Sequence, residues 1–140
     1  MPDSSSFPGD ATKQLHDAAR EAAEHAYAPY SGFRVGAALL FDDGFISTGC
    51  NVENVSYGLT ICAERAALFS AIAQRGPAHK IVAIAVTNLN AAPSPPCGAC
   101  RQVLAEFAAP NAIISFPGDN GLEQRPFAEI FPFAFHLDPK

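Results

Sequence analysis

The amino-acid sequence predicts an α/β protein of three layers, in which helices cover both faces of one mixed sheet. The first observation is the order of the predicted elements, which after an initial helix reads strand, strand, helix, strand, helix, strand. The second is the segment 80–88, whose apolar residues on both faces are typical of a central strand. The third is the length of 140 residues, which suits one domain that folds without disulfide bonds. We therefore expect a single domain over residues 11–140, preceded by a flexible lead over residues 1–10.

The first half of the chain predicts one helix and one β-hairpin. Residues 12–27 carry small apolar residues at helical spacing, and Pro29 ends this helix. Residues 35–41 are a continuous apolar run, and residues 45–52 return after the turn Asp42-Asp43-Gly44. Because an Asp-Gly pair accepts a positive φ, we expect the two runs to pair as antiparallel strands.

The second half predicts two more helices and two more strands. Residues 62–74 have helical periodicity, and Gly76-Pro77 stops the helix before the strand 80–88. Residues 91–96 contain three prolines and interrupt regular structure, but Pro96 suits the first turn of a helix over 97–108. A short strand over 112–116 follows, and residues 127–131 are expected to form one helical turn.

The charge pattern argues against nucleic acid and membrane partners. The formal net charge is −5, and no basic run could follow a phosphate backbone. The apolar runs are too short to span a bilayer, and the polar, acidic start does not resemble a signal peptide. We therefore expect a cytoplasmic protein. In that reducing compartment, four cysteines indicate a metal site or redox chemistry rather than disulfides.

Three cysteines are candidate ligands of a catalytic zinc ion. Cys97 and Cys100 are three residues apart at the start of one predicted helix, and Cys62 opens another. Helix N-termini lower the pKa of a thiol and so favour the thiolate that binds metal. Three protein ligands leave the fourth position of zinc open for water, as in catalytic sites. The spare carboxylate of Glu64 can then take a proton from that water.

Three thiolates leave a zinc core with a formal negative charge, which makes the metal a poorer Lewis acid. Hydrogen bonds donated to sulfur would draw charge away from it. Arg65, three residues after Cys62, and Gln102 are the expected donors.

Other interpretations of these residues stay open. A structural zinc could take a fourth ligand from Cys50 or from one of the four histidines, which are His16, His25, His79 and His136. Cys97 and Cys100 could form a redox pair, although no βαβ opening accompanies them. Glu64 and Arg65 could be ordinary first-turn residues, and Cys50 is best interpreted as a small buried hydrophobic residue.

The motifs resemble those of the zinc-dependent nucleoside and nucleobase deaminases. Cys-x-Glu at residues 62–64 is followed, 35 positions after Cys62, by the first Cys of Pro-Cys-x-x-Cys. Within that superfamily, the stretches 30–38 and 51–54 are similar to the small, homotetrameric cytidine deaminases. The resemblance covers the chain from about Leu15 to Phe135. It implies a five-stranded mixed sheet, one zinc per chain, and a homotetramer, with which the 49% of hydrophobic residues agrees.

The resemblance also implies roles for residues outside the zinc motifs. Asn51 and Glu53 resemble the pair that binds the ribose 3′-hydroxyl, and Phe33 resembles the aromatic that stacks on the pyrimidine, although it could be ordinary core. The backbone N–H of Ala63 would bind the pyrimidine O2. Tyr57 and Phe135 are the candidates that complete a neighbouring subunit's pocket.

The implied activity is hydrolytic deamination of cytidine and 2′-deoxycytidine to uridine and 2′-deoxyuridine, in pyrimidine salvage. Glu64 would act first as the base and then as the acid. The enzyme alternative is a deaminase of another aminopyrimidine nucleoside such as blasticidin S, against which the ribose-binding pair argues. The non-enzyme alternative is a zinc-stabilised interaction module with the Phe-rich tail as its docking patch.

Overall fold

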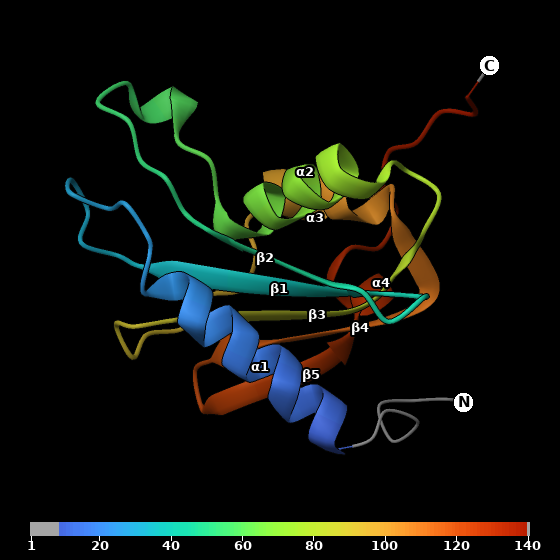
Figure 1. Ribbon diagram of the computed structural model, residues 1–140, viewed down its shortest axis with the longest axis horizontal. Coiled ribbons are helices and arrows are strands. Elements are labelled where there is room, and N and C mark those ends of the chain that lie inside the picture. Colours follow the sequence, from blue (N-terminus) through green and yellow to red (C-terminus); the bar gives the residue numbers. More distant parts are fainter. Residues whose placement is uncertain (1–8, 140) are drawn as a thin grey trace.

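The computed structural model describes residues 9–139 and contains one five-stranded sheet (Figure 1). The strand order is β2-β1-β3-β4-β5, in which β3 and β4 are parallel and the other neighbours are antiparallel. The strands are β1 (Val35–Phe41), β2 (Ile46–Cys50), β3 (Ile81–Asn88), β4 (Ala108–Gly118) and β5 (Gly121–Pro126). The mixed sheet predicted from the sequence is confirmed.

Helices cover both faces of the sheet, which confirms the three layers. Helix α1 (Gly9–Ala23) crosses one face, while α2 (Ala63–Arg75) and α3 (Gly98–Ala105) lie on the other (Figure 1). The larger core lies under α2 and α3 and includes Leu39, Leu68 and Ile114, each at most 1% exposed. Phe127, which opens the short helix α4 (Phe127–Ile130), joins the same core. A smaller core under α1 contains Leu15.

Several predicted boundaries are corrected. Helix α1 ends at Ala23 instead of residue 27, because Tyr27 leaves the helix and its N–H binds the carbonyl of Asn51. It begins at Gly9, so the last two residues of the expected lead belong to it, and residues 1–8 lie outside the described part. Helix α3 ends at Ala105, and β4 runs over residues 108–118 instead of 112–116.

Two glycines let the helices approach the sheet closely. A Cβ on Gly36 of β1 would lie 1.9 Å from the carbonyl oxygen of Ala19 in α1. A Cβ on Gly49 of β2 would lie 2.4 Å from the backbone nitrogen of Ala67 in α2. Because real Cβ atoms do not approach so closely, both positions require glycine. Gly49 therefore sets how the first turns of α2 lie against the sheet.

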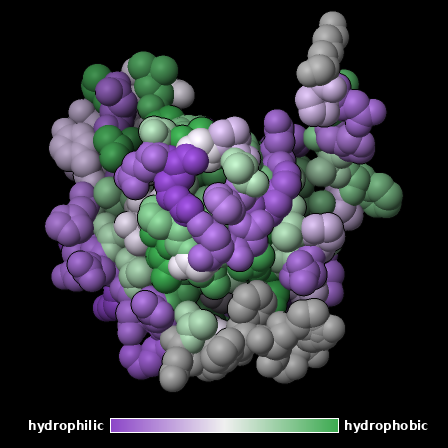
Figure 2. Space-filling model, turned by 45° about the vertical axis from the view of Figure 1, so that its right-hand side comes forward, coloured by the Kyte–Doolittle hydropathy of each residue, from purple (hydrophilic) through white to green (hydrophobic). Residues whose placement is uncertain are grey.

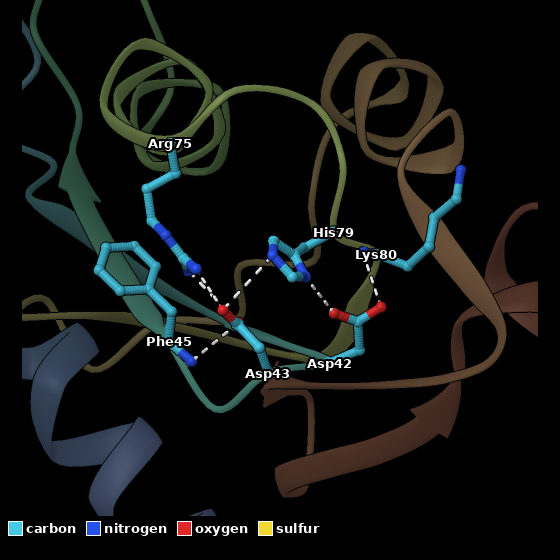
Figure 3. A network of polar contacts seen from close by, with 6 residues as sticks. All are labelled: Asp42, Asp43, Phe45, Arg75, His79 and Lys80. Atoms are coloured by element: carbon cyan, nitrogen blue, oxygen red, sulfur yellow. Dashed lines mark hydrogen bonds and ion pairs between the residues drawn. The ribbon is translucent and has the colours of Figure 1, made fainter.

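The tip of the β1–β2 hairpin is tied to the end of α2 by a polar network (Figure 3). Arg75 binds the carboxylate of Asp43, and His79 Nδ1 lies 2.8 Å from Asp42 Oδ1. The hydrogen bond from Arg75 lowers the pKa of Asp43 to about 2. The guanidinium of Arg75 also lies 4.2 Å from the centre of the Phe45 ring. This network fixes the C-terminal end of α2, opposite the end that opens at Cys62.

Within residues 9–139, no helix has the length and apolar character required to cross a membrane.

Candidate metal centre and cavity

The three predicted ligands converge at the starts of two helices. Cys62 is the N-cap of α2, and Cys97 is the N-cap of α3, where its sulfur accepts a hydrogen bond from the N–H of Cys100 at 3.4 Å. The sulfur atoms of Cys62 and Cys97 lie 3.9 Å apart. All three sulfurs lie within 4.8 Å of one another. Residues 35 positions apart in the chain thus form one thiol cluster.

The geometry of this cluster fits zinc. Two thiolates at 2.3 Å from a tetrahedral zinc are separated by about 3.8 Å, close to the separation of the Cys62 and Cys97 sulfurs. A guanidinium nitrogen of Arg65 donates to the Cys62 sulfur at 3.3 Å. Arg65 Nε is buried without a partner among the described residues, so this N–H needs an acceptor nearby. A thiolate of the cluster can serve as that acceptor.

The pKa values of the Cys62 and Cys100 thiols are shifted in opposite directions. Hydrogen bonds from Cys100 and Arg65 lower the pKa of Cys62 to about 5. The same bond to Cys62, together with burial, raises the pKa of Cys100. The lowered pKa favours the thiolate form of Cys62, which is the form that binds metal. The cluster contains no fourth Cys or His among the described residues, and Cys50 lies outside it on β2. This argues against a structural zinc, which would use four protein ligands.

Glu64 lies beside the thiol cluster on the first turn of α2. Its side chain is only 4% exposed, and burial raises its pKa to about 7, with the Cys62 thiolate adding to the shift. Ala63, between Cys62 and Glu64, is fully buried. A carboxyl that is buried next to the metal ligands, and that is not needed as a ligand, is placed to transfer protons.

These groups open into a cavity of about 350 Å³. The cavity is large enough for a nucleoside-sized ligand. It is lined by residues from the 31–35 segment, the end of β2, the start of α2 and the proline-rich segment, namely Ser31, Phe33, Val35, Asn51, Glu53, Thr60, Cys62, Ala63, Glu64, Val86, Ser94, Pro95 and Cys97. Every residue that the sequence analysis placed around a substrate is therefore present, except Tyr57 and Phe135.

Among the described residues, Asn51 keeps a free amide hydrogen and Glu53 keeps a free acceptor site. Asn51 Oδ1 accepts the N–H of Val35 at 2.9 Å, and its Nδ2 donates to the Phe33 carbonyl at 2.7 Å, which leaves one amide hydrogen. The Glu53 carboxylate accepts three hydrogen bonds, from two backbone N–H groups and the Ser31 hydroxyl, which leaves about one of its four lone-pair sites. One donor and one acceptor together match a single hydroxyl group.

Tyr57 and Phe135 do not reach the cavity of their own chain. Tyr57 is 75% exposed on the 3₁₀ turn Tyr57–Leu59, where its ring packs edge-on against Tyr30. Phe135 is 70% exposed in the C-terminal tail. The expectation for Gln102 is corrected, because its side-chain nitrogen donates to the Phe135 carbonyl at 2.9 Å instead of to a sulfur. Gln102 thus holds the tail against α3.

Three further residues, which were not predicted from the sequence, hold the site together. Arg101 donates to the carbonyls of Pro96 at 2.8 Å and Ile130 at 2.7 Å, so it braces the metal-binding turn against α4. Ser31 and Asn90 bind the segment that carries Phe33. Ser31 is two positions before Phe33 in the sequence, and a serine at this spacing could have indicated the hydrogen bond to the Phe33 N–H. Asn90 lies 56 positions after Arg34, and no local pattern links them.

Comparisons with known proteins agree with this geometry. Residues 10–116 match the family described as the cytidine and deoxycytidylate deaminase zinc-binding region. The chain is 48% identical to a cytidine deaminase of Halalkalibacterium halodurans over 82% of its own length and 86% of the relative's. It is 45% identical to a cytidine deaminase of Mycobacterium tuberculosis, covering 89% of both chains.

Solved structures of cytidine deaminases are also similar to this chain. The crystal structure of a cytidine deaminase from Burkholderia pseudomallei superposes with a TM-score of 0.79 at 46% identity, covering 88% of this chain and 98% of the other. The crystal structure of the Mycobacterium tuberculosis enzyme superposes with a TM-score of 0.78 at 42% identity, covering 90% and 98%.

Proposed function

The chain belongs to the family of cytidine and deoxycytidylate deaminases, and on that basis we propose that it converts cytidine and 2′-deoxycytidine, with water, to uridine and 2′-deoxyuridine plus ammonia. One observation carries the proposal. The same cavity is lined by Asn51 and Glu53, which can bind a hydroxyl group, and by Glu64, the buried carboxyl beside the three thiols. The reaction would serve pyrimidine salvage.

The substrate is a free nucleoside rather than a nucleotide. The described residues that line the cavity include no Lys, Arg or His to bind a 5′-phosphate. The free amide hydrogen of Asn51 and the remaining acceptor site of Glu53 fit the ribose 3′-hydroxyl. The ring of Phe33 offers an apolar face to the pyrimidine, and the N–H of Ala63 binds its O2. We do not expect blasticidin S to be a substrate, because it lacks the ribose that Asn51 and Glu53 would bind.

Cys62, Cys97 and Cys100 would hold one zinc ion, which would supply Lewis-acid activation of water at neutral pH. The carboxylate of Glu64 accepts a proton from the attacking water and delivers it to ring N3, which makes C4 electrophilic. As the water oxygen bonds to C4, the same carboxyl takes the remaining proton of that water and gives it to the C4 amino group, so that the C4–N bond breaks and ammonia leaves. Arg65 contributes by donating to the Cys62 sulfur, which offsets the negative charge of the thiolates.

The experiment is an ultraviolet assay of the zinc-loaded protein with cytidine, 2′-deoxycytidine, free cytosine, 2′-deoxycytidine 5′-monophosphate and blasticidin S. The proposal expects loss of cytidine absorbance and release of ammonia in equal amounts with both nucleosides. It expects much slower turnover of the other three compounds. A zinc-loaded protein that deaminates neither nucleoside would refute the proposal.

We also propose that the protein is a homotetramer in which Tyr57 and Phe135 complete the pockets of neighbouring subunits. Both side chains project into solvent, and Figure 1 shows their segments extending away from the body of the domain. In Figure 2, strongly hydrophobic residues are exposed on the projections at the upper left and at the right. Val55, Leu59 and Phe133 are at least 67% exposed, which favours burial by another copy. Light scattering that finds an active monomer would refute this.

We place the protein in the cytoplasm. All four cysteines are free thiols, and three of them must stay reduced to bind zinc. Fractionation of cells that produce the native protein tests this placement, with recovery in a secreted fraction as the contrary result.

A further inference from the structure

The Ser31 hydroxyl joins two parts of the proposed substrate pocket. It donates to Glu53 Oε2 and accepts the backbone N–H of Phe33 at 2.9 Å. Ser31 is therefore hydrogen-bonded both to the carboxylate expected to read the sugar and to the residue expected to face the base. Ser31 itself lines the cavity.

The two oxygens of Glu53 are held differently. Oε1 accepts the backbone N–H groups of Tyr30 at 2.9 Å and Ser31 at 3.2 Å, which no side-chain substitution at residue 31 removes. The hydrogen bond recorded for Oε2 comes from the Ser31 hydroxyl. The terminal torsion of a glutamate is broad, so a carboxylate held only at Oε1 can swing. The hydroxyl of Ser31 thus fixes the plane of the carboxylate, and with it the direction of the free lone pair.

We propose that Ser31 is a positioning residue for sugar recognition, whose hydroxyl orients Glu53 to accept the 3′-hydroxyl of the substrate. The inference rests on the proposed function and adds to it the residue that sets the preference for an intact 3′-hydroxyl. Ser31 does not act on the reacting base.

The segment that carries Phe33 has a second, independent brace. Asn90 Oδ1 accepts the N–H of Arg34 at 3.0 Å, and its Nδ2 donates to the carbonyl of Gly32 at 3.0 Å. These bonds flank Phe33 and do not involve Glu53. Asn90 therefore supports the base-facing residue alone, and a variant at Asn90 provides a matched comparison for one at Ser31.

The experiment compares ligands with and without the 3′-hydroxyl. Turnover is measured with cytidine and 3′-deoxycytidine, and binding is measured by calorimetry with uridine and 3′-deoxyuridine, which need no turnover. The variants are Ser31→Ala, Ser31→Cys, Ser31→Thr and Asn90→Ala. Ser31→Cys keeps nearly the size of serine but has only a weak donor, so it serves if Ser31→Ala does not fold.

The inference predicts that Ser31→Ala and Ser31→Cys lower kcat/KM for cytidine and affinity for uridine about tenfold or more, as expected for a bond to a charged group. The 3′-deoxy ligands should change by less than about threefold. Ser31→Thr, which keeps the hydroxyl, should restore the preference. Asn90→Ala should weaken both kinds of ligand by the same factor.

Equal losses for both ligands in the Ser31 variants would overturn the inference, because Ser31 would then act only on the fold or on Phe33. A wild-type protein that binds uridine no better than 3′-deoxyuridine would also overturn it. A wild-type protein that binds uridine selectively but does not deaminate cytidine would instead refute the proposed function and leave the role of Ser31 supported.

Discussion

Replacing Gly49 by alanine tests how the fold positions the metal site. The new Cβ would meet the backbone nitrogen of Ala67 at 2.4 Å and the carbonyl oxygen of Ala63 at 2.7 Å. Both neighbours are backbone atoms of α2, so no side-chain rotation can relieve the contact. Ordinary contact begins at 3.4 Å, so α2 and β2 must separate by about 3.4 − 2.4 = 1.0 Å near the turn that carries Glu64.

A displacement of this kind has consequences for stability and for zinc. Overpacking in a close-packed interior costs about 1–3 kcal/mol. For a chain of this size the melting temperature should fall on the order of 3 to 12 °C. Metal–ligand distances tolerate errors of about 0.2 Å, so Cys62 should bind zinc less well. A catalytic group misplaced by about 1 Å can cost about 100-fold in kcat/KM.

The assay combines a thermal melt, a chelator competition for zinc and the ultraviolet rate with cytidine. Gly36→Ala is the matched comparison, because its Cβ would meet Ala19 in α1 on the other face of the sheet at 1.9 Å. Gly36→Ala should lose stability as well, but keep its zinc affinity and rate when measured well below its melting temperature. Gly49→Ala with unchanged zinc affinity and kcat/KM would refute the reasoning.

Three further variants test other parts of the account. Arg65→Gln removes the donor to the Cys62 sulfur and should weaken zinc binding about 10- to 100-fold, which a chelator titration measures; unchanged affinity would show that Arg65 is a bystander. Asp43 has its pKa lowered from 3.8 to about 2 by Arg75, so its stabilising effect is present above about pH 4 and is lost as the pH falls towards 2. The gap in melting temperature between wild type and Asp43→Asn should close over that range, and a constant gap would exclude the ion pair as its cause. Phe135→Ala should lower activity most in dilute protein, where tetramers dissociate, and a concentration-independent loss would count against a shared pocket.

The metal site could be predicted because its information is local. Cys97 and Cys100 are three positions apart at the start of one helix, so their spacing predicts that the two side chains meet, and Cys62 and Glu64 lie together at the start of another helix. That the two halves meet depends on the sheet, which the apolar patterns of β1 and β3 also predicted. Sequence reasoning therefore succeeded where both the motif and the core pattern were strong.

Strand β5 was missed because it is an edge strand. Its side chains are mostly exposed on both faces, so Leu122 to Arg125 show no apolar alternation. The Asn120-Gly121 pair was the available signal for a turn, and Gly121 indeed has a φ of +111°. β5 pairs with β4 directly through this turn.

The hydrogen-bond partners of polar side chains also could not be predicted from the sequence. Gln102 was expected beside sulfur, yet its partner is a carbonyl 33 positions away in the tail. Asn90 binds the Phe33 segment from 56 to 58 positions away, through contacts that only the tertiary structure creates. A polar side chain has many possible partners at similar energy, so sequence spacing does not select among them.

The central claim is that Glu64 transfers the protons of a zinc-dependent deamination. Glu64→Gln keeps the shape of this buried side chain, which is 4% exposed, and removes its proton-transfer capacity. We expect one zinc per chain and retained uridine binding in this variant, with turnover of cytidine lowered ~10²- to 10⁴-fold. Turnover near the wild-type rate, or a fully active wild-type protein without metal, would contradict it.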